Sequence, residues 1–132
     1  MKEDILVYVL FALPLGVPLG LWWFNSWAQR RACQLLRTVL TEEQYRQMVQ
    51  RGYLDIRSPS HPQRFYRVPK APGPVHLIEN EQVQTDLCLQ PLDWVPNADF
   101  VLIHKLMIEA DEETYLQKAN RFVPLHASRS IG

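Results

Sequence analysis

The sequence predicts an α+β domain carried on a single N-terminal transmembrane helix, and three observations support this. Residues 5–24 hold no charged side chain, and a helix of that length at about 1.5 Å per residue matches one bilayer crossing. Residues 53–89 alternate short β-rich segments with turn residues, which predicts a small antiparallel sheet of roughly three or four strands. The flanking segments 30–52 and 97–123 space their apolar residues as helices do, so helices should flank the sheet.

The apolar run has to be distinguished from a signal peptide. Small residues around Ala28 make cleavage after that residue the alternative interpretation. However, the apolar region of a signal peptide spans about 7–15 residues behind a positive start, and this run is longer. The positive charge of Lys2 is also offset by two acidic residues that follow it. We therefore expect an uncleaved anchor.

The charges beside the run predict its orientation. Only Lys2 precedes it, whereas Arg30, Arg31 and Arg37 follow it, and basic residues stay on the cytoplasmic side. This predicts the inner (cytoplasmic) membrane of the cell as the location, with the N-terminus outside and the C-terminal domain in the cytoplasm. Aromatic residues gather at that same end, where indole rings sit at headgroup depth. The predicted membrane-interface residues are Trp22, Trp23, Trp27, Arg30 and Arg31.

Prolines and glycines alternate within the run, at Pro14, Gly16, Pro18 and Gly20. The simpler interpretation is a kinked single-pass anchor. The alternative is a span that docks against other transmembrane helices, because small residues four apart let two backbones approach closely. A neighbouring protein would also satisfy the backbone groups that the prolines leave unpaired. We favour docking against membrane-embedded core subunits.

The chain has no formal net charge, but its two halves differ. Residues 30–70 hold nine basic side chains against three acidic ones, and residues 71–120 hold nine acidic against two basic. A basic belt beside the anchor suits anionic lipid headgroups. Nucleic-acid binding is the competing use of such a belt, but the arginines form no continuous run and the far half is acidic. We expect no nucleic-acid partner.

Local signals predict two helices after the apolar run. An apolar stripe continues beyond the membrane as an amphipathic stem; its members are Ala28, Ala32, Leu35, Leu36, Val39 and Leu40. Thr41 and Gln44 then form a capping box, which predicts the start of a short helix. Gly52 is a typical residue to end it.

Four strands are expected next, over residues 53–56, 65–68, 75–79 and 83–89. The last two would form a hairpin, and the alternation in the last strand places Val83, Thr85, Leu87 and Leu89 on one face. Residues 99–108 are almost wholly apolar and fit either a buried helix or a buried strand. We favour a helix, with Asn97 as its cap.

A last helix is expected to begin at Asp111 and to end before Pro124, with residues 128–132 as a loose tail. The predicted organisation places a transmembrane anchor over residues 1–29 and a juxtamembrane helical stem over 30–52. A small α+β cytoplasmic domain follows over 53–126, with a flexible tail over 127–132.

The densest group of potential ligands is the carboxylate cluster Glu109, Asp111, Glu112 and Glu113. Such groups can bind a divalent metal or serve as an acid–base pair, which keeps an enzyme as a remote alternative. An acidic first turn is, however, the ordinary signal of a helix start, and we expect a solvated one here. His104, inside an apolar run, is expected to be a core residue rather than an axial ligand.

The cysteines carry no metal or haem motif. Cys88 is expected to be a small core residue, and Cys33, near the headgroups, could be acylated. The chain also contains no phosphate-binding or nucleophile motif. We therefore assign no catalytic residue, no metal ligand and no cofactor, and expect no enzymatic activity.

Four segments carry a resemblance: Leu-Thr-Glu-Glu-Gln at 40–44, Arg-Gly-Tyr-Leu-Asp-Ile at 51–56, Tyr-Arg-Val-Pro at 66–69, and the segment 104–116 that begins His-Lys-Leu-Met. Together they resemble small bacterial proteins to which no activity is assigned. The resemblance spans roughly residues 40–122 and leaves out the anchor. It implies a shared domain and no functional residue.

These features predict a single-pass accessory or structural subunit of a larger bacterial membrane complex, such as a photosynthetic or respiratory one. The docking-type span, the uneven charge and the lack of site chemistry favour this role. The alternative is a membrane-tethered adaptor or sensor domain that binds a soluble partner or small ligand.

Overall fold

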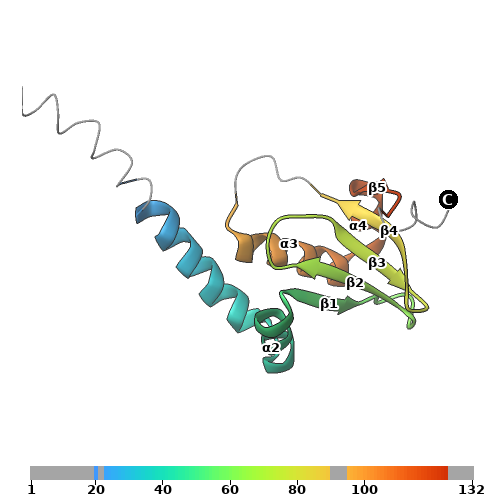
Figure 1. Ribbon diagram of the computed structural model, residues 1–132, viewed down its shortest axis with the longest axis horizontal. Helices are drawn as coiled ribbons and strands as arrows, with labels where there is room; N and C mark the ends of the chain where they lie inside the picture. The colour runs from blue at the N-terminus through green and yellow to red at the C-terminus, as the bar shows by residue number, and fades with distance from the viewer. Residues whose placement is uncertain (1–19, 21–22, 90–94, 125–132) are drawn as a thin grey trace, which may run out of the picture.

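The computed structural model describes residues 20, 23–89 and 95–124 (Figure 1). One antiparallel sheet has its five strands in sequence order, so every strand pairs with its neighbour along the chain. The strands are β1 (Tyr53–Arg57), β2 (Arg64–Pro69), β3 (Val75–Glu79), β4 (Gln82–Cys88) and β5 (Asn120–Phe122). The α+β class and the antiparallel sheet are confirmed.

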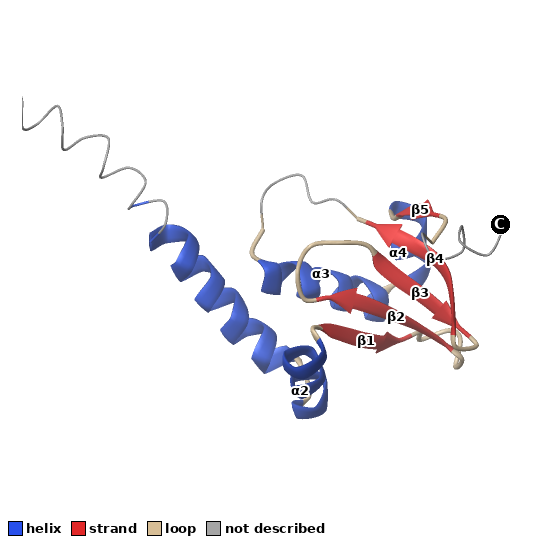
Figure 2. Ribbon diagram, in the orientation of Figure 1, coloured by secondary structure: helices blue, strands red, loops and turns tan. Residues whose placement is uncertain are grey.

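The helices flank this sheet (Figure 2). A helix over residues 23–39, named the stem helix here, leads down to α2 (Glu42–Arg51) beside strand β1. After the sheet, α3 (Asn97–Ala110) crosses one face, and α4 (Glu112–Lys118) connects it to β5. The helix interpretation of residues 99–108 is therefore confirmed.

Local signals fix the ends of α2 as predicted. The Gln44 backbone N–H donates to Thr41 Oγ1 at 3.2 Å, and the Thr41 N–H donates to Gln44 Oε1 at 3.1 Å. These two bonds satisfy donors that the first helical turn leaves unpaired. Gly52 ends the helix at φ 76°, a conformation that glycine adopts without steric cost.

The core lies between α3 and the inner face of the sheet. Cross-strand neighbours Leu54 and Val68, and Ile56 and Tyr66, are almost completely buried on that face. Val101 and Ile108 of α3 are equally buried and belong to the same apolar cluster. The stem helix joins this cluster through Ala32, Leu36 and Leu40. The domain core therefore includes part of the stem.

Strand β1 lies at the edge of the sheet, and α2 covers part of that edge. Gln47 Oε1 accepts from the Asp55 backbone N–H at 3.4 Å, and Gln47 Nε2 donates to the Asp55 carboxylate at 3.0 Å. An edge strand with free backbone groups invites pairing with other chains. The Gln47 side-chain amide accepts a hydrogen bond from one of these groups, the Asp55 N–H, which is then no longer free to pair with another chain.

Three expectations were wrong in detail. Asn97 is the first helical residue of α3 and not its cap, since Pro96 holds the cap position without a side-chain bond. The last helix ends at Lys118, and residues 120–122, predicted to be helical, form β5. The pairing register shifts between Leu77 and Ile78, which puts Val83 and Thr85 on opposite faces and leaves Val83 exposed.

Candidate functional site

The first described turns of the stem helix expose large aromatic side chains. Trp23, Phe24 and Trp27 have 70, 63 and 52% of their surface exposed. The Arg31 guanidinium lies 5.2 Å from the centre of the Trp27 ring, within cation–π distance. We call Trp23, Phe24 and Trp27, with the exposed Arg30 and Arg31, the aromatic collar.

About one turn after Trp27, the stem helix begins to bury its apolar side chains instead of exposing them. Ala32, Leu36 and Leu40, four residues apart, are at most 7% exposed and form one stripe against the domain. Leu35 and Val39, which the sequence placed on the same stripe, are 51 and 37% exposed. The lower half of the stem helix is thus fixed to the domain, whereas its upper half carries apolar rings that the described residues do not cover.

The predicted membrane residues fall only partly within this region. Pro14, Gly16, Pro18 and Trp22 lie outside the described residues, as does most of the apolar run. Gly20 is helical and exposed, and a Cβ added there would meet no described atom within 4 Å. Among the residues that the structure describes, no helix is both long and apolar enough to cross a membrane.

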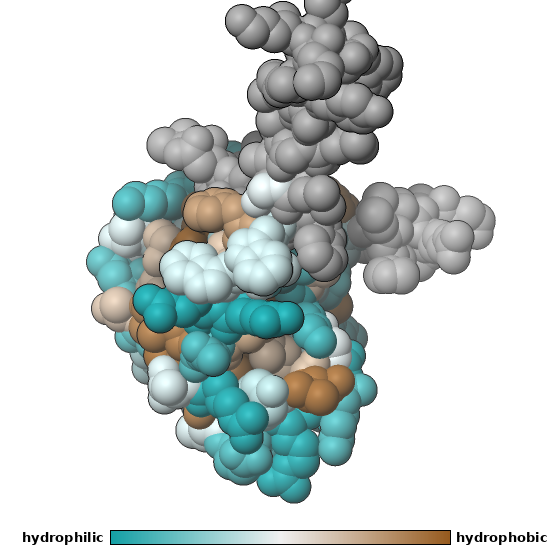
Figure 3. Space-filling view, turned by 90° about the vertical axis from the view of Figure 1, so that its left-hand side faces the viewer, coloured by the Kyte–Doolittle hydropathy of each residue, from teal (hydrophilic) through white to brown (hydrophobic). Residues whose placement is uncertain are grey.

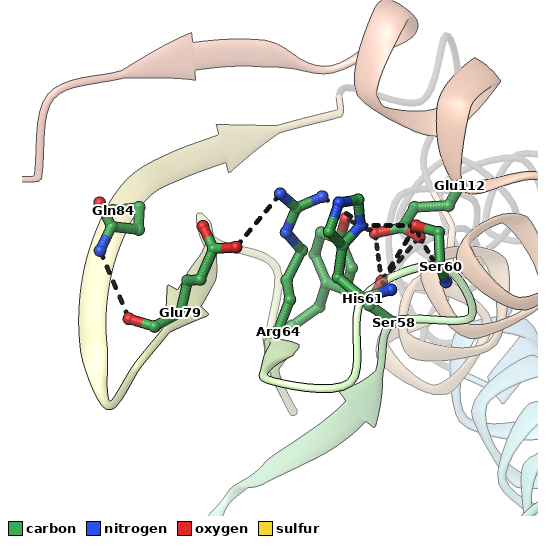
Figure 4. A network of polar contacts seen from close by, with 8 residues as sticks. Ser58, Ser60, His61, Arg64, Glu79, Gln84 and Glu112 are labelled. Atoms are coloured by element: carbon green, nitrogen blue, oxygen red, sulfur yellow. Dashed lines mark hydrogen bonds and ion pairs between the residues drawn. The ribbon is translucent and has the colours of Figure 1, made fainter.

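A second arrangement surrounds the Glu112 carboxylate in the domain interior (Figure 4). Ser58 Oγ lies 2.8 Å from both carboxylate oxygens, and Tyr66 Oη donates to Oε1 at 2.5 Å. Ser60 donates to Oε2 through its hydroxyl and, at 3.3 Å, through its backbone N–H. The Arg64 guanidinium lies 3.5 Å from Oε1 and also contacts Glu79 at 3.4 Å. Glu112 thus joins the β1–β2 loop to the start of α4.

These contacts determine the charge state of Glu112. Burial by itself would raise its pKa, but the hydrogen bonds from Ser60, Tyr66 and Ser58 outweigh burial and lower the pKa to about 2. For Tyr66, burial and the adjacent Glu112 carboxylate raise the pKa, so its hydroxyl stays protonated and donates. At neutral pH the site therefore holds an ionised buried carboxylate that accepts hydrogen bonds from Ser58, Ser60 and Tyr66.

Ser60, His61 and Glu112 lie close together but not in the order of a catalytic serine–histidine–carboxylate triad. Ser60 Oγ lies 2.8 Å from His61 Nδ1 and also donates to Glu112, so the serine lies between histidine and carboxylate. In a catalytic triad the histidine lies between serine and carboxylate and accepts the serine proton. A carboxylate with a pKa near 2 is also a weak base. This geometry is suited to holding a loop in place.

The acidic cluster does not converge on one point. Glu109 pairs with Lys105 along α3, and Asp111 caps α4 by accepting from the Thr114 N–H at 3.0 Å. Glu113 is exposed, and Glu112 alone turns inward. The expected helix start at Asp111 is confirmed, but the expectation that its carboxylates are solvated was wrong for Glu112. No group of three or more potential metal ligands occurs within the described part of the chain.

His104 is a core residue, as expected. Its ring is 1% exposed, packs against Phe100 at a centroid distance of 4.4 Å, and places Nδ1 2.8 Å from Tyr115 Oη. Burial lowers the pKa of His104 to about 4, so the ring is neutral at physiological pH. Of the two cysteines, Cys33 is exposed on the stem helix and Cys88 is half-buried in β4.

The outer face of the sheet carries a row of polar residues at one level across four strands. Asp55, Arg67, His76 and Asp86 are successive cross-strand partners. Asp55 accepts from Arg67 Nε at 2.8 Å and from Nη2 at 3.0 Å, and His76 Nδ1 lies 2.5 Å from Asp86. The Arg67 guanidinium also stacks on Tyr53 at 4.1 Å. Cross-strand pairs of this kind stabilise a sheet.

Sequence reasoning did not identify the partners of Glu112. Ser58 and Ser60 lie between the strands predicted over 53–56 and 65–68, and Tyr66 lies within the second of them. No local signal in the sequence indicates that this loop lies beside the start of α4, because the contacts join residues more than 40 positions apart. No family model, no curated protein and no solved structure matches this chain.

Proposed function

We propose that this chain is a single-pass accessory subunit of a membrane protein complex, with its α+β domain held in a fixed orientation relative to the membrane by the stem helix. The observation that carries the proposal is that the stem helix exposes its aromatic side chains up to Trp27 and buries its apolar side chains in the domain core from Ala32 onward. Exposed large aromatics beside arginines are typical of a membrane interface. A helix with such residues at one end and core contacts at the other connects a membrane segment to a domain without a flexible linker.

The rigid connection supports a structural role. The stem helix shares the domain core through Leu36 and Leu40, so the orientation of the span would set the orientation of the domain. The predicted transmembrane run ends within the collar, and its prolines and glycines suit docking against neighbouring helices. A domain oriented in this way can cover a defined surface of a larger complex.

The exposed Cys33 provides a test of the topology. We expect a membrane-impermeant maleimide to label it in inside-out vesicles and to leave it unlabelled in right-side-out vesicles. The Cys88→Ser variant restricts the reaction to Cys33, and Cys33→Ser supplies the background. Equal labelling of both preparations would contradict a cytoplasmic domain on a membrane anchor.

Gly20→Leu distinguishes an accessory subunit from the alternative, a tethered adaptor that uses its span only as an anchor. A Cβ added at Gly20 meets no described atom within 4 Å, and Gly20 lies far along the helix from the core residues Ala32 and Leu36, so we expect the domain to fold unchanged. If the span docks on partner helices, the variant should be lost from the complex on a native gel. The adaptor alternative is favoured if Gly20→Leu leaves all associations intact.

A further inference from the structure

A polar groove of about 640 Å³ lies between α2 and the β1 edge of the sheet. Three arginines line it, Arg46 and Arg51 from α2 and Arg57 from the end of β1. Hydrophilic side chains gather at the lower end of the molecule in Figure 3, the end at which Figure 1 shows α2. A second hollow of about 590 Å³ adjoins the groove and shares Asp55 and Arg57 with it.

The groove carries a net positive charge, although it is lined by equal numbers of arginines and acidic residues. Within the described residues Arg46, Arg51 and Arg57 form no ion pair. Two of the acidic residues along the groove are already paired, since Asp55 binds Arg67 and Glu109 binds Lys105. Of the three acidic residues that line the groove, only Glu43, on α2 itself, has no ion pair within the described residues, so the groove has an excess of about two positive charges on a chain with no net charge.

The position of the groove argues against a lipid headgroup as its ligand. From Arg31, the last residue of the collar, the stem helix continues to residue 39, which at 1.5 Å per residue is about 12 Å. That distance exceeds the Debye length of about 8 Å at physiological salt, beyond which the attraction between exposed charges is largely screened. Headgroups at the level of the collar are therefore poorly placed to neutralise these arginines.

The shape and the edge chemistry favour an extended acidic chain. The groove is open and follows α2 from Thr41 to Arg51, so it does not enclose a small anion. Gln47 already occupies the outward backbone N–H of Asp55, which hinders recognition by strand addition. Recognition would rest on guanidinium–carboxylate pairs, which form bidentate bonds and tolerate varied spacing along a peptide.

We propose that this groove binds an acidic segment of a neighbouring protein, with Arg46, Arg51 and Arg57 as the charged contacts. The identity of the partner as a fellow subunit rests on the proposed function. The binding itself does not, because it can be measured on the isolated chain. Loss of peptide binding and absence from a membrane complex are thus separate failures.

The test uses the full chain in detergent and a fluorescein-labelled octaglutamate peptide, with octaglutamine as the uncharged control. We expect saturable binding of octaglutamate alone, weakened roughly tenfold when salt is raised from about 50 to 300 mM. The triple variant Arg46→Gln, Arg51→Gln, Arg57→Gln should bind roughly tenfold or more weakly. The control variant Lys118→Gln, Arg121→Gln removes two exposed positive charges from α4 and β5, at the edge of the sheet opposite β1, and should bind within about twofold of the wild type.

Three outcomes would overturn the proposal. Equal loss of binding in the groove variant and the control variant would show attraction by overall charge rather than by the groove. Absence of octaglutamate binding would exclude an acidic peptide. Displacement of the peptide by inorganic tripolyphosphate at a far lower concentration than by free octaglutamate would assign the groove to a phosphate-bearing ligand. Far-UV circular dichroism of each variant checks that it is folded.

Discussion

Replacing Glu112 with glutamine perturbs the buried network at its centre while keeping the side-chain shape. The carboxylate accepts hydrogen bonds from Ser58, Ser60 and Tyr66, and it lies beside the Arg64 guanidinium. A glutamine would turn an NH₂ group toward some of these donors and would remove the negative charge. We expect the Glu112→Gln variant to be folded but markedly less stable at neutral pH.

The magnitude follows from the pKa. Lowering the pKa of Glu112 from 4.5 to about 2 means that folding favours the ionised carboxylate over the protonated form by roughly 3 kcal/mol. Because the folded-state pKa lies below the unfolded one, this stability is complete above about pH 4.5 and is lost as the pH falls toward 2. Glu112→Gln should therefore cost about 3 kcal/mol at pH 7, and the cost should shrink below pH 4.

The assay is guanidinium unfolding of both proteins in detergent, followed by circular dichroism at several pH values between 2.5 and 7. Glu113→Gln is the matched control, because Glu113 is exposed in the same turn and its loss should cost less than about 0.5 kcal/mol. A Glu112→Gln cost below about 0.5 kcal/mol at pH 7, or one that does not change with pH, would refute the assigned role of the network.

Three further substitutions test separate elements. Burial lowers the pKa of His104 to about 4, so the unfolding free energy of the wild type should fall by up to roughly 3 kcal/mol between pH 6.5 and 4. His104→Gln, which keeps a polar group near Tyr115, should make the unfolding free energy less dependent on pH in this range. An unchanged pH dependence would contradict a buried neutral ring. Glu81 follows Asn80 in the β3–β4 turn with both residues at positive φ. Glu81→Gly should therefore raise the unfolding free energy by about 0.5–1 kcal/mol, and a loss of stability would argue against this turn. Thr41→Ala should cost about 1 kcal/mol through the lost cap of α2, whereas an exposed-residue control, Gln50→Ala, should be near neutral in the same thermal melts.

The parts of the fold that the sequence predicts are those with local causes. The capping box of Thr41 and Gln44 and the αL position of Gly52 depend on residues within one turn, and both are present. Strand β5 was missed because its three residues pair with β4 and have no strong local preference of their own. A strand over residues 120–122 can be predicted only when it is already known that the outer edge of β4 is free to pair.

In the candidate site, too, features with local causes can be predicted from the sequence and features that depend on distant residues cannot. The aromatic residues of the collar can be read from composition, but the boundary at Ala32 depends on which helix face the domain covers. Leu35 and Leu36 are equivalent as residue types, yet Leu36 is buried and Leu35 exposed. The burial of Glu112 depends on Ser58 and Tyr66, which lie far away in the sequence. A helix-start signal cannot reveal such long-range partners.

The central claim, that the chain is a membrane-anchored subunit, is tested most directly by mild detergent extraction of the native protein followed by a native gel and mass spectrometry. We predict that the wild-type chain migrates in fixed stoichiometry with other membrane proteins. We also predict that the Gly20→Leu variant is released from them, with an unchanged unfolding midpoint of its domain. Migration of the wild type as a lone small species, after extraction gentle enough to preserve known complexes of the same membrane, would contradict it.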